Sequence, residues 1–252
     1  AAGESAVGSV FHDLNGNRAR DAEEPGIEGV CVSNGREVVK TDAAGRWQLP
    51  VSEDTGFFVI KPRGWRVPVD GNQIPQHFYL HKPNGSPTLD PPGVPPTGPL
   101  PASIDFPLYP NEEPDTFRML LFGDTQARGL REVNFVTRDV VEELIGVEAA
   151  FGMSLGDNVA DDVLLFQELN EAIAQIGIPW YNVFGNHDND RGALENRHRD
   201  EHFEKVFGPS TYAFEYGQVV FIPINDVFFK PDGGYTCKLT EEQLAFLRNY
   251  LA

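Results

Sequence analysis

Three short polar signatures decide the fold of this sequence: Phe122-Gly123-Asp124-Thr125-Gln126, Leu155-Gly156-Asp157-Asn158 and Phe184-Gly185-Asn186-His187-Asp188. Each follows an apolar run that is too short for a helix and is bounded by glycine, which is typical of a buried β-strand. The runs are Met119–Phe122, Ala149–Leu155 and Trp180–Phe184. Each predicted strand therefore ends at a carboxylate or an amide.

Helix-length segments separate the three signatures. In Arg131–Ile145 and in Val163–Ile176, apolar residues recur at spacings of three and four. Strands that alternate with helices in this way form a parallel sheet, and the carboxyl ends of its strands share one edge. We therefore expect Asp124, Asp157 and Asn186 to converge. Two carboxylates brought close together would repel each other, so this convergence predicts a bound cation.

The order of the signatures resembles that of the calcineurin-like metallophosphoesterase superfamily, which carries D-x-H, G-D-x-x and G-N-H-[DE]. The resemblance implies a layered αββα sandwich that hydrolyses a phosphomonoester or a phosphodiester. It also implies two divalent metal ions (Mn, Fe, Zn or Mg) and a bridging water as the nucleophile. The metal ligands would be Asp124 and Gln126 for the first ion, Asp157 for both ions, and Asn186 for the second.

Other residues would act on the substrate. The resemblance implies that His187, with its ring oriented by Asp188, stabilises developing charge on the phosphate or protonates the leaving oxygen. Arg191 follows closely and is a candidate for binding the phosphate, although a solvated helix face also accounts for the basic stretch that it begins. Asp161 and Asp162 are expected to cap the helix that follows them.

The sequence departs from the family pattern at two places. Gln126 stands where most of the family has histidine, and an amide oxygen favours Mn²⁺ or Mg²⁺ over Zn²⁺ or leaves the first metal loosely held. The 252 residues also end just after Thr240–Leu247, which resembles the helix before the family's fourth signature. The domain is therefore expected to be incomplete at its C-terminal edge, without the later histidine ligands. The alternative function is a non-catalytic binding or scaffold protein that keeps the phosphoesterase fold.

The amino-terminal third has a different pattern. From Val7 to Leu49, short apolar runs alternate with Gly, Asn and Asp turns, which is typical of an antiparallel β-sandwich. Val10–Asn17 and Thr41–Pro50 resemble the signatures of prealbumin-like or SdrD B-like domains of secreted bacterial proteins. Such a domain precedes the catalytic domain in one group of bacterial calcineurin-like phosphoesterases, and the whole chain resembles that group.

A loop in this region has the oxygen-ligand spacing of an EF-hand Ca²⁺ site. Positions 1, 3, 5, 9 and 12 of the loop are Asp13, Asn15, Asn17, Asp21 and Glu24. Position 6, where the sharp turn favours glycine, is Arg18 instead. The alternative is a loop rich in Asx turns, whose side chains are satisfied by their own backbone.

Length fits two domains, which we place at residues 1–110 and 115–252. The stretch 82–101 is dense in proline and glycine and could be a linker. However, Ile104–Leu108 alternates like one more strand of the sandwich, so this stretch is predicted to be a loop of the first domain. The hinge would then be Pro110–Asp115.

Charge and composition limit the partners. Lys plus Arg is 20, Asp plus Glu is 38, and the net charge is −18, so nucleic acid and anionic membranes would be repelled. A small-molecule phosphoester remains the expected substrate, and the first domain could contact glycan or cell wall. Cys31 and Cys237 have no motif partner and suggest no redox centre. The family resemblance and the calcium-type loop favour a periplasmic or secreted bacterial protein.

Overall fold

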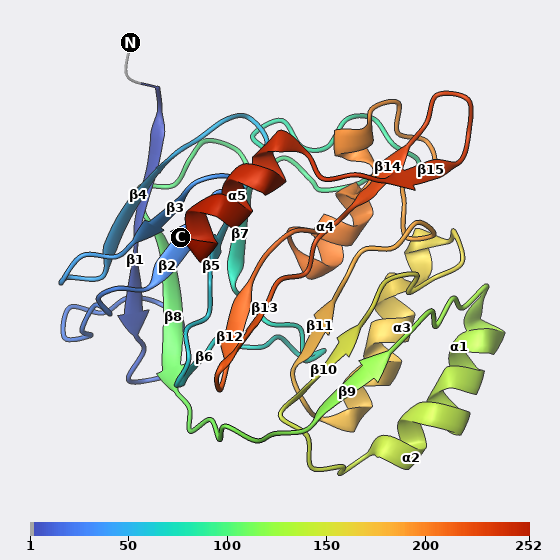
Figure 1. Ribbon diagram of the computed structural model, residues 1–252, viewed down its shortest axis with the longest axis horizontal. Coiled ribbons are helices and arrows are strands. Elements are labelled where there is room, and N and C mark those ends of the chain that lie inside the picture. Colours follow the sequence, from blue (N-terminus) through green and yellow to red (C-terminus); the bar gives the residue numbers. More distant parts are fainter. Residues whose placement is uncertain (1–2) are drawn as a thin grey trace.

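The computed structural model describes residues 3–252, and its β-rich first part lies beside a parallel sheet flanked by helices (Figure 1). The first eight strands are β1 (Ser5–His12), β2 (Cys31–Ser33), β3 (Val38–Lys40), β4 (Arg46–Pro50), β5 (Thr55–Val59), β6 (Trp65–Arg66), β7 (Phe78–His81) and β8 (Ile104–Pro110). They form two four-stranded sheets, ordered β4-β1-β8-β6 and β3-β2-β5-β7.

The alternation of side chains explains how these two sheets pack. In β4, Trp47 and Leu49 are buried while Arg46 and Gln48 are exposed, because successive residues of a strand point to opposite faces. Both sheets contribute to one core: Val10, Val32, Trp47, Leu49, Phe57, Phe106 and Leu108. The pairing differs from the predicted antiparallel pattern at one place, since β1 and β8 are parallel.

The second part begins with a parallel sheet of order β11-β10-β9. Its strands are β9 (Met119–Phe122), β10 (Phe151–Ser154) and β11 (Trp180–Asn182). The helical segments between them are α1 (Leu130–Val136), the π-helical turn η1 (Thr137–Val141), α2 (Glu142–Leu144), η2 (Val163–Leu165), α3 (Phe166–Ile173) and η3 (Ala174–Ile176). These strands and helices lie where the hydrophobic periodicity predicts them.

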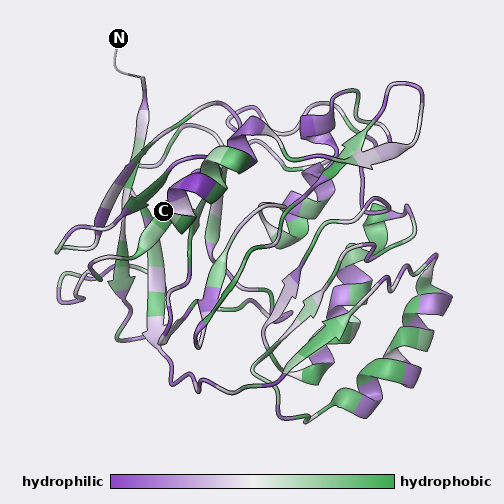
Figure 2. Ribbon diagram, in the orientation of Figure 1, coloured by the Kyte–Doolittle hydropathy of each residue, from purple (hydrophilic) through white to green (hydrophobic). Residues whose placement is uncertain are grey.

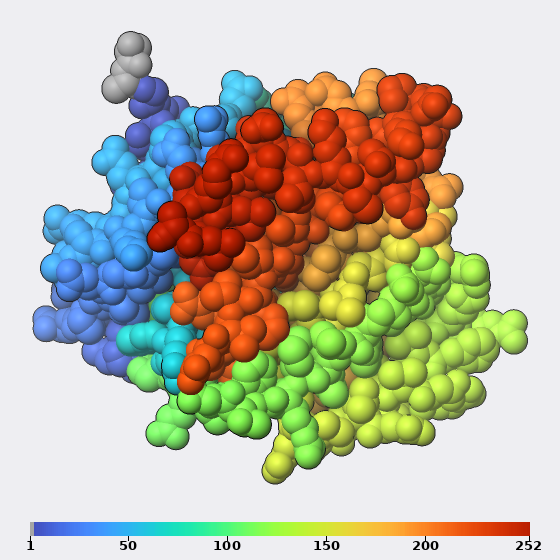
Figure 3. All heavy atoms as spheres, viewed as in Figure 1, coloured from blue at the N-terminus to red at the C-terminus, as the bar shows by residue number. Residues whose placement is uncertain are grey.

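The remaining elements follow the third signature. They are η4 (Asn196–His198), α4 (Glu201–Phe207), β12 (Phe214–Tyr216), β13 (Val219–Phe221), β14 (Val227–Phe229), β15 (Tyr235–Cys237) and α5 (Glu241–Leu251). A capping box between Thr240 and Gln243 fixes the start of α5. The helix lies against the N-terminal strands, as the dark red and blue spheres show (Figure 3), and Asn249 Nδ2 donates to Arg36 O at 2.9 Å.

The parallel sheet is covered on both faces, and its strands β9 and β10 are largely apolar (Figure 2). On one face, helical side chains pack with Trp180: Val133, Val141, Phe166, Leu169, Ile173 and Phe203. On the other, Phe151 and Tyr181 pack with Phe214 and with Phe58 from the first part. A single core therefore includes residues from both predicted domains.

The predicted hinge, residues 110–115, is anchored by Glu113. Its side chain is 1% exposed and forms an ion pair with Lys61 Nζ at 2.5 Å. The same carboxylate accepts from the backbone N–H groups of Gly64 and Gly217, both at 3.1 Å. One buried side chain thus ties the connection to segments on either side of it.

Candidate active site

The loops that follow the three parallel strands contact one another at the carboxyl edge of the sheet. The Gln126 backbone N–H donates to Asp157 O at 3.0 Å, and Ala127 forms a parallel bridge with Val159. The His187 backbone N–H donates to Asp157 Oδ1 at 2.9 Å. The loop after β10 therefore lies between the loops after β9 and β11, with Asp157 in contact with both.

Glycine permits this close contact. A Cβ at Gly185 would lie 2.0 Å from the Asp157 nitrogen and 2.3 Å from its Oδ1 atom, so no other residue fits there without movement of the backbone. Because Asn186 follows Gly185 directly, the contact also brings Asn186 beside the second signature. The glycines of these signatures are thus needed for packing as well as for turning the chain.

Three of the predicted metal ligands have strained backbones. Asp124, Gln126 and Asp157 are left-handed, with φ of 48°, 39° and 48°. Residues other than glycine rarely adopt this region, and such strain is often found at functional sites. All three residues lie in the loops that directly follow β9 and β10.

The two aspartates differ in their surroundings. Asp157 is 9% exposed, and its Oδ2 atom accepts from Gln126 Nε2 at 2.8 Å. The amide of Gln126 thus presents its NH₂ end, and not its oxygen, to Asp157. Asp124 is exposed, two residues after the end of β9. Asn186 is half-buried, and its backbone carbonyl oxygen accepts a hydrogen bond from Asn189 Nδ2 at 2.8 Å.

Asp161 holds the ring of His187, which differs from the predicted role of Asp188. His187 Nδ1 lies 2.9 Å from Asp161 Oδ1. An ionised carboxylate can only accept a hydrogen bond, so Nδ1 carries the proton and Nε2 is the nitrogen that can exchange one. The sequence assigns Asp161 to helix capping, but Asp162 is the N-cap, with Oδ1 accepting from the Leu164 N–H at 3.2 Å.

Asp188 instead connects the loop of the second signature to the loop of the third through buried hydrogen bonds. Its carboxylate is fully buried and accepts from Asn158 Nδ2 and the Gly185 N–H, both at 2.9 Å, and from the Val159 N–H at 3.1 Å. Burial raises the pKa of Asp188 to about 7, against these hydrogen bonds, which lower it. Asp188 therefore joins the second and third signatures, and Asn158 is the partner that the sequence analysis missed.

Arg191 completes the outer part of the site. Its guanidinium lies 2.5 Å from Asp161 Oδ2, so one carboxylate contacts both Arg191 and His187. Burial would raise the pKa of Asp161, but these two contacts outweigh it and hold that pKa below the usual value. The sequence signal that could have pointed to Asp161 is its position four residues after Asp157 in the loop of the second signature.

The calcium-type loop is closed by its own hydrogen bonds. Asp13 accepts from the N–H groups of Gly16 at 2.6 Å and Arg18 at 2.9 Å, and from the Tyr109 hydroxyl at 2.7 Å. Arg18 is left-handed, with φ of 64°, at the position where an EF-hand favours glycine. Asn15 and Asn17 donate to Asp21, and Glu24 accepts from the Leu14 and Asp21 N–H groups. These contacts are those of the Asx-turn alternative, and Ca²⁺ binding stays a prediction.

Comparison with known proteins supports the superfamily through a part of the chain that lies outside the three signature loops. The family model described as the N terminal of calcineurin-like phosphoesterase matches residues 13–89. No curated protein matches the chain. Among solved structures, a purple acid phosphatase from yellow lupin (Lupinus luteus) seeds is similar at 12% identity, with a TM-score of 0.37. The similarity covers 89% of this chain and 43% of that one, so the chain spans less than half of that protein's length.

Within residues 3–252, none of the helices combines the length and the apolar character needed to cross a bilayer.

Proposed function

We propose that this protein is a metal-dependent phosphoester hydrolase whose site lies at the carboxyl edge of the β9–β11 sheet. The observation that carries the proposal is the position of Asp157, which joins the loops of all three signatures through Gln126 and His187. The family match at residues 13–89 supports the same superfamily independently, because it lies outside these loops. The position of that match, ahead of the signatures, also supports our proposal of the bacterial group with an N-terminal β-domain. Export from the cytoplasm is proposed on the resemblance to that group alone.

The residues present fit divalent metal ions. Asp124, Gln126, Asp157 and Asn186 would hold the ions, and their donors are the carboxylate and amide oxygens that Mn²⁺ and Mg²⁺ prefer. Both Asp157 oxygens already accept one hydrogen bond, but a carboxylate oxygen has a second lone pair to share. When bound, such ions supply Lewis-acid activation of a phosphoester and lower the pKa of water toward neutrality.

The chain's own residues would supply proton transfer and positioning. Asp161 accepts the Nδ1 proton of His187, so it is Nε2 that would carry the second proton of a protonated ring and give it to the leaving oxygen of the ester. The Arg191 side chain is 67% exposed, so its guanidinium is accessible to a phosphate. The ion pair with Asp161 orients this guanidinium. Asp188 keeps the loop of His187 against the loop of Asp157.

Hydrolysis of p-nitrophenyl phosphate and of bis-p-nitrophenyl phosphate with Mn²⁺ tests this proposal. We expect Asp157→Asn to lower turnover by about 10³-fold, because this residue joins the metal site to the neighbouring loops. Asp162→Asn is the matched control, since it removes a carboxylate from the same loop that only caps a helix, and its turnover should equal that of the wild type. Metal binding without turnover of either ester would favour the non-catalytic alternative.

A further inference from the structure

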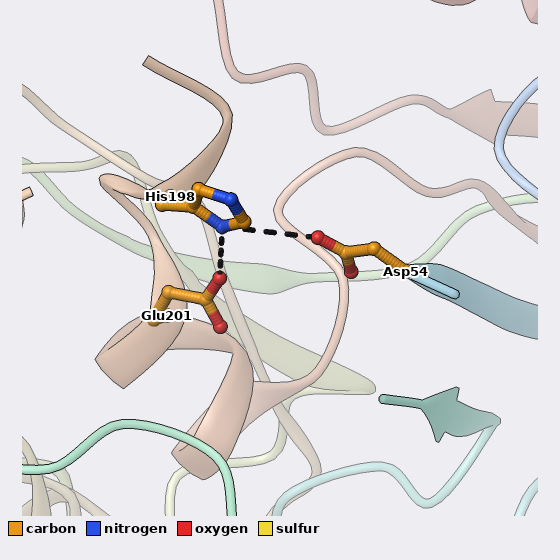
Figure 4. A group of neighbouring side chains, drawn as sticks. All are labelled: Asp54, His198 and Glu201. Carbon is orange, nitrogen blue, oxygen red and sulfur yellow. Dashed lines mark hydrogen bonds and ion pairs between the residues drawn. The ribbon is translucent and has the colours of Figure 1, made fainter. Parts of the chain in front are cut away.

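A second group of potential ligands lies outside these loops and contains Asp54, His198 and Glu201 (Figure 4). Asp54 precedes β5, His198 is the last residue of η4, and Glu201 is the first residue of α4. His198 Nδ1 lies 2.6 Å from Glu201 Oε1 and 3.8 Å from Asp54 Oδ2. Within residues 3–252, this is the group in which three His, Cys, Asp or Glu ligand atoms lie within 4.8 Å of one another.

The carboxylate oxygens of Asp54 and Glu201 that do not face His198 have partners of their own. Lys82 Nζ lies 2.8 Å from Asp54 Oδ1 and 2.8 Å from Glu201 Oε2. The Ser86 hydroxyl also donates to Glu201 Oε2, at 2.5 Å. These partners fix both carboxylates so that Oδ2 and Oε1 face the imidazole. Outer partners of this kind orient the ligands of protein metal sites.

Charge and spacing both favour a cation at this point. Lys82 also contacts Glu204, at 2.9 Å, but burial raises the pKa of that carboxyl well above its usual value, so the charge of Lys82 is set mainly against Asp54 and Glu201. The 3.8 Å between His198 Nδ1 and Asp54 Oδ2 is too long for a hydrogen bond. Two ligands bound at about 2.1 Å to a tetrahedral ion lie roughly 3.4 Å apart, which is close to that value. The 2.6 Å between His198 Nδ1 and Glu201 Oε1 is a hydrogen-bond distance, and it would lengthen by roughly 0.8 Å when both atoms bind one ion.

We propose that Asp54, His198 and Glu201 bind one divalent transition-metal ion of the Zn²⁺ class. One imidazole nitrogen and two carboxylate oxygens are a donor set that Zn²⁺ accepts. The side chains of Glu201 and His198 are 0% and 17% exposed, whereas that of Asp54 is 37% exposed, so water reaches the group from the Asp54 side as a fourth ligand. Binding would release the proton that His198 shares with Glu201.

The role of this ion would be structural. Asp54 belongs to the β-rich first part, whereas His198 and Glu201 belong to the helical layer that follows the third signature. One ion would therefore connect these two parts of the chain directly. The site uses none of the residues assigned to phosphoester hydrolysis, so the inference does not depend on the proposed function.

Zn²⁺ titration of the full chain tests the site, with Asp124→Asn and Asp157→Asn introduced together to remove carboxylates of the proposed active site. We expect one equivalent of Zn²⁺ to bind this background. Zn²⁺ at about 100 times its Kd should raise the Tm by roughly 5 °C. Co²⁺ in place of Zn²⁺ should give a visible absorption spectrum that His198→Gln abolishes.

Two neighbouring variants decide the assignment. Asp54→Asn should weaken Zn²⁺ binding by about tenfold or more, whereas Glu53→Gln removes one negative charge from the same exposed loop and should leave the affinity unchanged. Because Asp54 is partly exposed, its variant can be measured even if His198→Gln does not fold. Zn²⁺ binding that neither Asp54→Asn nor His198→Gln alters would overturn the proposal and leave a network of ion pairs around Lys82.

Discussion

Two loop systems in this protein combine aspartates with left-handed turns, and they use these aspartates differently. In the loop of residues 13–24, Asp13 is 3% exposed and accepts from the Gly16 and Arg18 backbone of its own loop. At the edge of the parallel sheet, Asp157 accepts instead from Gln126 and His187, which belong to loops after two other strands. Asp13 therefore closes mainly its own loop, with one further hydrogen bond from the Tyr109 hydroxyl of β8. Asp157 instead joins loops that follow different strands.

Among the residues that are not proposed to bind metal, His187 should give the largest effect on turnover when its side chain is removed. In Mn²⁺-loaded protein, His187→Ala is expected to lower kcat for a chromogenic phosphoester by about 10²-fold, because Nε2 can no longer donate a proton. Metal content, measured by elemental analysis, should stay unchanged. His12→Ala is the control, since that histidine lies on β1, outside the site. Loss of metal from His187→Ala would place this residue among the ligands.

Asp13→Ala should affect stability and leave the chemistry intact. The substitution leaves the Gly16 and Arg18 N–H groups and the Tyr109 hydroxyl without their acceptor, so the free energy of unfolding should fall by about 2 kcal/mol. Urea denaturation measures this loss, and kcat should not change. A large fall in kcat would show that the two loop systems are coupled, which our comparison excludes.

The same variant tests the calcium prediction. If the loop binds Ca²⁺, added Ca²⁺ raises the Tm of the wild type but not that of Asp13→Ala. A crystal structure with millimolar Ca²⁺ and an empty loop would leave only the Asx-turn interpretation.

Asp161→Asn should have a smaller effect on turnover, because the amide oxygen can still accept from His187 Nδ1 without the negative charge. We expect kcat to fall by about tenfold, which corresponds to ~1.4 kcal/mol. An NMR signal from the Nδ1-bound proton of His187 should shift at the same time. Asp162→Asn changes the adjacent carboxylate and should alter neither quantity, so equal effects of the two variants would contradict the positioning role of Asp161.

The smallest expected effect is a dependence of stability on pH at Asp13. Burial raises the pKa of this carboxyl, but the hydrogen bonds from Tyr109, Arg18 and Gly16 outweigh it, and the folded-state pKa lies below 3.8. The group therefore stabilises the fold above its unfolded-state pKa, and this contribution is lost as the pH falls through the lower folded-state value. The stability difference between the wild type and Asp13→Asn should shrink on acidification from pH 5 to about pH 2. A constant difference would refute this linkage.

The sequence predicted the elements better than the contacts between them. Strand β9 and the helical segment 163–176 were found because hydrophobic periodicity is a local property of the chain. The partner of His187 was not found, because Asp161 reaches it only through a left-handed turn in another loop. Likewise, local patterns gave no sign that Phe58 packs with Phe214 in a core shared by both parts.

For the candidate site, likewise, the sequence predicts which residues take part but not where their side chains point. Its composition follows from the three signatures, since polar residues at the ends of parallel strands meet at one edge of the sheet. The direction of each side chain depends on individual hydrogen bonds, such as those that turn Asp188 toward Asn158 and the Val159 N–H. Spacing alone does not specify those bonds, so the assignment of Asp188 to the ring of His187 was wrong.

Glu113 has a consequence for how the protein melts. Its single carboxylate contacts Lys61 Nζ and the backbone N–H groups of Gly64 and Gly217, so separating the two parts of the chain would remove at least one partner from this buried charge. Loss of a hydrogen bond to a buried charged group typically costs about 1.5–3 kcal/mol, which disfavours opening of one part while the other stays intact. We therefore expect the chain to unfold as one cooperative unit, and calorimetry should show a single transition in place of two successive ones.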